Sequence, residues 1–179
     1  MSPLDFITAY YNWLGTQPEE VIYKRNEYLS VEGGVENYLY LVLSGAVRAI
    51  YVSKEEEFTI RFGYKGSVIS SLDSFISGKP SQFYLQAIRK TVVYKLEKSS
   101  YTAFVKSTPE VAEIHFELMN GLLTSMLDRE IDLLTSSPLE RYNRVLKRSP
   151  NLFQEVPMKY IASYLRMSPE TLSRLRNID

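Results

Sequence analysis

The 179-residue sequence predicts an α+β protein with an N-terminal antiparallel β-roll, a long helix and a C-terminal helix–turn–helix. Three observations predict this class. Residues 21–98 hold several short β-rich runs separated by glycine turns, which is typical of a small antiparallel barrel or roll. Residues 110–134 change to a helical period. Residues 157–177 then carry two short helical patterns joined by a three-residue turn.

Composition excludes several classes of protein. The chain is 45% hydrophobic and 23% charged, which is an ordinary globular balance. It has no Cys, which excludes disulfides, Cys-ligated zinc and iron–sulfur clusters, and its one histidine, His115, predicts no metal or haem site. No stretch reaches the roughly 18 apolar residues of a membrane span, and the first residues lack signal-peptide features. We therefore expect a cytoplasmic protein with no metal site and no membrane partner.

The first expected elements are one helix and a series of strands. Residues 3–14 form an amphipathic helix that Ser2-Pro3 opens and Gly15 closes. The stretch YLYLVLSGAVRAIYV holds two β-rich runs on either side of a turn signal at Ser44-Gly45. Glycine turns are expected at residues 33–34, 45, 63, 66 and 78. The pattern fits either a barrel or a roll.

The helix expected over residues 110–134 would be roughly 37 Å long at the α-helical rise. Its apolar residues fall on two adjoining stripes: Ile114, Leu118 and Leu122, then Leu123, Leu127, Ile131 and Leu134. Two stripes are more than one side of a small roll can cover, which favours a homodimer seam through this helix. The alternative is a helix packed wholly within its own monomer.

Three short helices are expected after Ser136-Ser137-Pro138, over residues 138–149, 157–165 and 168–177. The segment SPNLFQEV is interpreted as the loop between the first two. The last two have helix–turn–helix spacing, with Ile161, Ala162, Leu165, Leu172 and Leu175 facing inward. The alternative is a helical hairpin that only packs.

In a DNA-reading unit of this kind, the second helix enters the major groove with its N-terminus first. Ser168 is expected to cap that helix and Pro169 to take its first position. The residues expected to meet base edges are Pro169, Glu170, Ser173 and Arg174. The residues expected to meet phosphates are Lys159, Arg166, Ser168, Thr171 and Arg176.

Charge is distributed unevenly although the net charge is zero. Residues 1–140 carry 13 basic and 18 acidic side chains, net −5, whereas residues 141–179 carry 8 and 3, net +5. A small basic module on an acidic body favours contact with a polyanion.

Taken together, these segments resemble the Crp/Fnr superfamily of transcription regulators. YLYLVLSGAVRAIY resembles the start of the family's cyclic-nucleotide-binding β-roll, a double-stranded β-helix, and GSVISSLDSFISGKPSQFYLQA falls at its phosphate-binding cassette. Residues 110–134 resemble the dimerisation helix. IASYLRMSPETLSRL resembles the recognition unit, with its Ser-x-Glu-Thr-x-x-Arg run on Ser168, Glu170, Thr171 and Arg174.

The resemblance implies three domains: an effector roll over residues 1–109, a dimerisation helix over 110–135 and a DNA-binding domain over 136–179. It implies a homodimer on a pseudo-palindromic site in double-stranded DNA, with RNA polymerase as a further partner. Arg166 occupies a turn position that commonly holds glycine, so a positive φ is expected there. Pro169 stands where the family's type member has a DNA-contacting Arg.

The cassette departs from the family pattern. The family's Gly-Glu pair, which binds the ribose, becomes Ser70-Ser71, and its Arg-Ser pair, which binds the cyclic phosphate, becomes Ser81-Gln82. The hydroxyls that the dimerisation helix offers to the purine become Met126-Leu127. Each lost charge-assisted contact is worth about 1.5–3 kcal/mol, so cyclic AMP is not expected to bind. The candidate effector residues are Ser70, Ser71, Leu72, Ser81, Gln82, Met126 and Leu127.

Two questions stay open at this point. The hydroxyl-rich cassette suits either a neutral ligand or a pocket filled by its own side chains. The wing that follows the family's recognition helix is not encoded before Asp179, so either the chain is trimmed or this branch manages without one. That leaves, as an alternative function, a ligand-sensing roll whose helix–turn–helix no longer binds DNA.

An enzyme is not expected. The sequence has no nucleophile elbow and no phosphate-cradling glycine loop, so no catalytic residue is assigned. The acidic run Glu55-Glu56-Glu57 is interpreted as a solvated hairpin tip.

Overall fold

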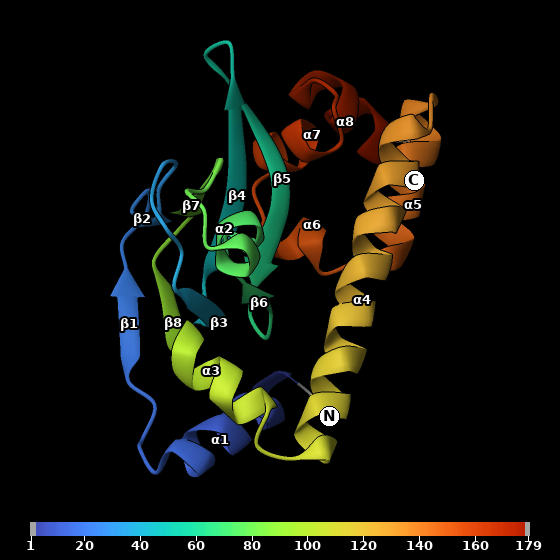
Figure 1. Ribbon diagram of the computed structural model, residues 1–179. Coiled ribbons are helices and arrows are strands. Elements are labelled where there is room, and N and C mark those ends of the chain that lie inside the picture. The colour runs from blue at the N-terminus through green and yellow to red at the C-terminus, as the bar shows by residue number, and fades with distance from the viewer. Residues whose placement is uncertain (1–2, 178–179) are drawn as a thin grey trace. The chain divides into compact units, whose positions relative to one another are not determined.

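The computed structural model describes residues 3–177, which divide between two compact units, Met1–His115 and Phe116–Asp179 (Figure 1). The first unit contains α1 (Pro3–Leu14), β1 (Glu20–Tyr23), β2 (Tyr28–Ser30), β3 (Tyr38–Ser44), β4 (Ala46–Ser53), β5 (Glu56–Tyr64), β6 (Val68–Ile69), α2 (Leu72–Ser77), β7 (Phe83–Ala87), β8 (Thr91–Glu97) and α3 (Lys98–Val105). Helix α4 (Pro109–Leu134) leads into the second unit, which continues with α5 (Pro138–Arg148), α6 (Leu152–Glu155), α7 (Met158–Tyr164) and α8 (Pro169–Arg176). No helix within residues 3–177 combines the length and the apolar character needed to cross a membrane.

The strands form the expected roll from two four-stranded antiparallel sheets, ordered β1-β8-β3-β6 and β2-β7-β4-β5. The core lies between the sheets, because alternate residues of each strand point to one face. Its fully packed members come from both sheets: Tyr40, Val42, Val47, Ala49, Ile69, Leu85 and Val93. The prediction of an antiparallel β-roll is confirmed.

The turn at Gly45 is a corner between the sheets. The two β-rich runs that flank it belong to β3 in one sheet and β4 in the other. Gly45 has φ +89°, and a Cβ there would lie 2.5 Å from the carbonyl oxygen of Lys90. Only glycine fits this corner. The glycine turn expected at Gly63 was wrong: Gly63 lies inside β5, where a Cβ would come within 3.1 Å of Ile69.

Helices α1 and α3 pack together through aromatic side chains (Figure 1). The ring of Phe104 lies 5.3 Å from that of Phe6 and 5.6 Å from that of Tyr10, both edge-on. The Tyr11 hydroxyl donates to the Lys95 carbonyl oxygen at 2.7 Å, which ties α1 to β8. The helix predicted over residues 3–14 is confirmed.

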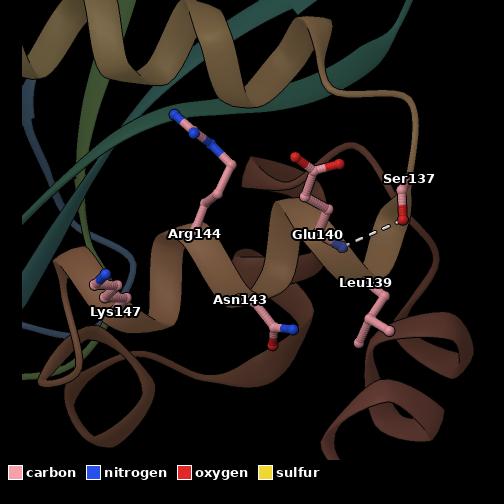
Figure 2. A pocket seen from close by; sticks show the side chains of 6 residues that line it. All are labelled: Ser137, Leu139, Glu140, Asn143, Arg144 and Lys147. Atoms are coloured by element: carbon pink, nitrogen blue, oxygen red, sulfur yellow. Dashed lines mark hydrogen bonds between the residues drawn. The ribbon is translucent and has the colours of Figure 1, made fainter.

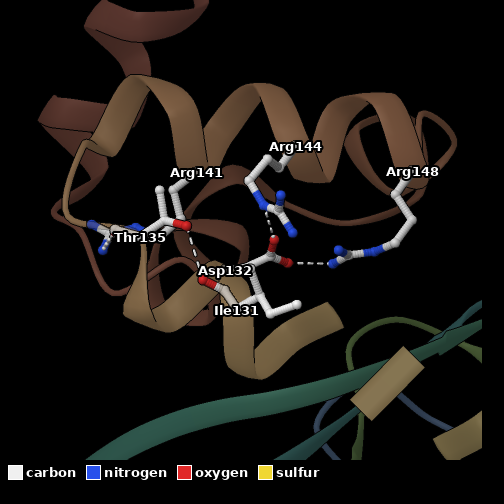
Figure 3. Close-up of polar contacts among 6 residues, drawn as sticks. All are labelled: Ile131, Asp132, Thr135, Arg141, Arg144 and Arg148. Carbon is white, nitrogen blue, oxygen red and sulfur yellow. Dashed lines mark hydrogen bonds and ion pairs between the residues drawn. The ribbon is translucent and has the colours of Figure 1, made fainter. Parts of the chain in front are cut away.

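In the second unit, α5 is held to α4 by a buried carboxylate (Figure 3). The Asp132 side chain is 3% exposed; its Oδ1 accepts from Arg144 Nε at 2.9 Å, and its Oδ2 pairs with Arg148 Nη2. Arg141 Nη1 donates to the Thr135 carbonyl oxygen at 3.0 Å, next to the break between the helices. These contacts hold α5 against the end of α4.

The segment SPNLFQEV was wrongly predicted as a loop throughout, because its middle forms the short helix α6. Leu152 and Val156 are buried, and the ring of Phe153 lies 5.3 Å from that of Tyr142 on α5. Burial of these apolar side chains stabilises a single turn of helix that the local sequence does not predict.

Candidate nucleic-acid interface and ligand cassette

Helices α7 and α8 form the predicted helix pair (Figure 1). Ile161, Leu165 and Leu172 are at most 1% exposed and make the seam between them. Ala162 is also buried, where a larger side chain would separate the helices. The inward-facing set expected from the sequence is therefore buried, except that Leu175 is half-buried.

The turn between the helices has the expected backbone. Arg166 takes φ +55°, as predicted for a position that commonly holds glycine. Met167 N donates to the Ala162 carbonyl oxygen at 3.1 Å and closes the end of α7. Ser168 Oγ then accepts from Thr171 N at 3.1 Å, and Pro169 begins α8. Both ends of the turn are fixed by hydrogen bonds.

The residues predicted to contact DNA lie on the outside of this pair. Thr171 is half-buried, and the others are exposed: Lys159, Arg166, Ser168, Pro169, Glu170, Ser173, Arg174 and Arg176. The pKa of the Glu170 carboxyl is lowered by its own backbone amide, by Ser168 and by the charge of Arg174. The first turn of α8 therefore presents an ionised acceptor, with a guanidinium one turn further along the helix.

The cassette residues mostly bond to the chain itself. Ser70 Oγ donates to the Tyr38 carbonyl oxygen at 2.7 Å, and Ser71 Oγ lies 3.4 Å from Ser30 Oγ. Ser70, Ser71 and Ser81 are buried, whereas Gln82 is exposed. Leu72 is the half-buried first residue of α2. Met126 and Leu127 are exposed residues of α4 in the second unit, and their part in an effector site stays a prediction.

Glu36 is a cassette neighbour that sequence reasoning missed. It is 3% exposed; Oε1 accepts from Tyr38 N at 2.9 Å and from the Tyr40 hydroxyl at 3.3 Å, while its backbone N donates to Ser74 Oγ at 2.8 Å. Oε2 has no hydrogen-bond partner among the described residues. Burial raises the pKa of this carboxyl. A single acid in a polar loop looks like a solvated residue, so no sequence signal could have found it.

A surface hollow of about 400 Å³ lies along α5 and holds none of the predicted site residues (Figure 2). It is lined by Ser137, Leu139, Glu140, Asn143, Arg144 and Lys147. Figure 2 shows Arg144 pointing away from Leu139 and Asn143, so these side chains do not converge on one point. Arg144 is already paired with Asp132, and Ser137 Oγ accepts from Glu140 N as a helix cap. The hollow does not carry a ligand site.

The comparison that decides the family concerns the roll. Residues 20–108, which span all eight strands, match the family model described as cyclic nucleotide-binding domain. These residues belong to the cyclic nucleotide-binding domain family. The resemblance seen in the sequence is confirmed for this domain. The description is that of the family, and it does not identify a ligand of this chain. No protein with a curated description matches the sequence.

Solved structures extend the likeness of the chain beyond residue 108. FixK2 from Bradyrhizobium japonicum is 23% identical, with a TM-score of 0.77 over 90% of this chain and 84% of that one. The Thermus thermophilus catabolite activator protein is 23% identical, with a TM-score of 0.58 over 99% and 86%. A cyclic nucleotide-binding domain containing protein from Listeria monocytogenes is 14% identical, with a TM-score of 0.72 over 99% and 90%. At these identities the likeness shows the fold, which is that of the Crp/Fnr regulators.

Proposed function

We propose that this chain is a homodimeric, DNA-binding transcription regulator of Crp/Fnr type whose cassette does not bind cyclic AMP. The observation that carries the proposal is the exposed face of α8, where Glu170, Ser173 and Arg174 stand on a capped and buried helix pair. Glutamate can accept from cytosine N4, and arginine can donate to guanine O6 and N7. The names of proteins with the same fold, such as the catabolite activator protein, support the same conclusion.

The uncovered stripe of α4 supports the dimer. Leu123, Leu127 and Leu134 are 58%, 61% and 78% exposed, and Phe116 is 59% exposed. Phe116 and Leu123 are seven residues apart, as are Leu127 and Leu134, which is the heptad spacing of a helix seam. Two copies joined through this stripe would hold two α8 helices for half-sites about 34 Å apart. A cytoplasmic location and contact with RNA polymerase follow from this proposal.

The absence of cyclic AMP binding is supported by the cassette. Ser71 and Ser81 stand where the family has its ribose Glu and phosphate Arg, and both hydroxyls are buried in contacts with the chain. Calorimetry with cyclic AMP should give no heat of binding at micromolar concentrations. A micromolar Kd would contradict this part of the proposal and leave the DNA-binding part standing.

Fluorescence anisotropy on duplex DNA tests the main proposal. The affinity should fall steeply with salt, because each phosphate contact releases counterions. After selection of a preferred sequence from random duplexes, Arg174→Ala should relax preference at one base pair per half-site, at a cost of about 1–3 kcal/mol.

Lys159→Ala is the matched control, because Lys159 is expected to meet a phosphate. It should weaken all sequences alike and lower the salt slope by about one per subunit. Weak binding with little salt dependence would favour a ligand-sensing roll that does not bind DNA. An unchanged base preference in Arg174→Ala would remove that residue from the reading role.

A further inference from the structure

Asp73, in the first turn of α2, uses both oxygens of its carboxylate inside the cassette. Oδ1 accepts from Ser81 Oγ at 3.1 Å, and Oδ2 accepts from the backbone N of Gln82 at 2.8 Å. Ser81 is 3% exposed, and its Oγ also accepts from Phe83 N at 3.0 Å. The two donors just before β7 are therefore held by one internal anion.

The position of Ser81 and Gln82 in the cassette indicates what their contact with Asp73 does. The family resemblance puts Ser81-Gln82 at the Arg-Ser pair that binds the cyclic phosphate. A carboxylate and a phosphate are both anionic acceptors and suit the same hydroxyl and amide donors. We infer that Asp73 is an intramolecular anion that takes the phosphate position, and that it is the residue that makes this cassette reject anionic effectors. This inference rests on the proposed function of the roll as an effector domain.

Charge and connectivity make the rejection strong. A phosphate that approached Ser81 and Gln82 would have to displace Asp73 and remain within a few ångströms of its negative charge, where repulsion is largest. Asp73 also competes as part of the same chain, so its effective concentration exceeds that of a free ligand.

The first test asks whether a free anion can replace the carboxylate. Asp73→Ala in the full chain should lower Tm by about 2–4 °C. Sodium formate or inorganic phosphate should restore that loss in a saturable manner, because an anion that binds only the folded state stabilises it. Sodium chloride at equal ionic strength should not do so, and the wild-type Tm should show no saturable rise with any of the three salts, only the general stabilisation that phosphate gives folded proteins.

Asp73→Asn is the matched control, because its amide fills the same space without the charge and leaves no room for a free anion. It should lose stability without rescue by formate or phosphate. If the anions raise the Tm of Asp73→Ala and of the wild type equally, or raise the Tm of neither protein, Asp73 only stabilises the loop and the inference is wrong. This readout uses no DNA, so its failure is distinct from failure of the proposed regulator function.

The second test uses cyclic AMP as the probe. Ser71→Glu with Ser81→Arg returns the family's two charged groups, but the introduced guanidinium should pair with Asp73 and leave binding undetected by calorimetry. Adding Asp73→Ala should then bring binding into the detectable range, an improvement of roughly tenfold or more, because the guanidinium becomes available to the phosphate and the space of the carboxylate is free. Equal affinity with and without Asp73, or no binding by either variant, would overturn the inference.

Discussion

Glu36 shows how one buried carboxyl sets a pH dependence. Its pKa is raised above the ordinary 4.5 by burial, and hydrogen bonds from Tyr38 N and the Tyr40 hydroxyl offset only part of that rise. The folded state therefore holds its proton at pH values where the unfolded chain has lost it. Stability from this group is full below the ordinary pKa and is lost as pH rises through the folded pKa.

Glu36→Gln should remove this loss. The amide keeps an acceptor oxygen for Tyr38 N and the Tyr40 hydroxyl, and it buries no charge. We expect the difference in free energy of unfolding between the variant and the wild type to shift in favour of the variant from pH 5 to pH 8, with the variant the more stable at pH 8. Urea unfolding measures the free energy of unfolding at both pH values. Glu19→Gln, at an exposed position, is the control and should not change that free energy at either pH. A variant less stable at pH 8 would contradict the prediction.

Some features of single residues could be predicted from the sequence, and others could not. The cap at Ser168 and the positive φ at Arg166 follow from local rules of helix ends, so they could be predicted. Glu57 could not: it was grouped with a solvated tip, yet its Oε2 accepts from the buried Arg48 Nη2 of β4 at 2.7 Å. Arg48 also donates to Gln86 on β7. Such pairing depends on strand register, which no local pattern supplies.

At the scale of elements, the junction of α4 and α5 depends on Asp132. Its carboxylate is buried between Arg144 and Arg148, whose side chains are 35% and 26% exposed. Asp132→Ala should lower the free energy of unfolding by about 3 kcal/mol, near the low end for a broken buried pair, since both cations can turn toward water.

Glu130→Ala is the control for Asp132, because Glu130 lies two residues earlier on the same helix and is exposed. It should lose less than about 1 kcal/mol. Urea denaturation followed by circular dichroism compares the two variants. Equal losses would show that Asp132 has no special role in joining the helices.

Elements with a strong period could be predicted from sequence, and elements stabilised by packing could not. The helix expected over residues 110–134 is α4, and the pair at the C-terminus is α7 and α8. Helices α2 and α6 are six and four residues long, too short to show a period, and tertiary contacts hold them. In the cassette, the loss of the family's charges could be predicted, but the bonds from Ser81 and Gln82 to Asp73 could not.

At the scale of the whole molecule, the exposed stripe of α4 predicts the oligomeric state. Leu127→Glu would put a charge into the proposed seam and should convert a dimer to a monomer at micromolar concentrations. Ser125→Glu adds the same charge at an exposed position on the opposite side of the helix and should leave the dimer intact. Sedimentation equilibrium distinguishes these results. A wild-type monomer, or a Leu127→Glu dimer of unchanged affinity, would contradict the proposed assembly.

The order of strands in the roll has a consequence for how the chain folds. Glu20 on β1 lies opposite Tyr94 on β8, so the first strand has no partner until more than seventy further residues have been made. Contacts between such distant parts of a chain slow folding, whereas the short helices of the second unit close mostly local contacts. During synthesis β1 would therefore wait as an unpaired edge, and β8 would be the strand whose arrival completes the sheet.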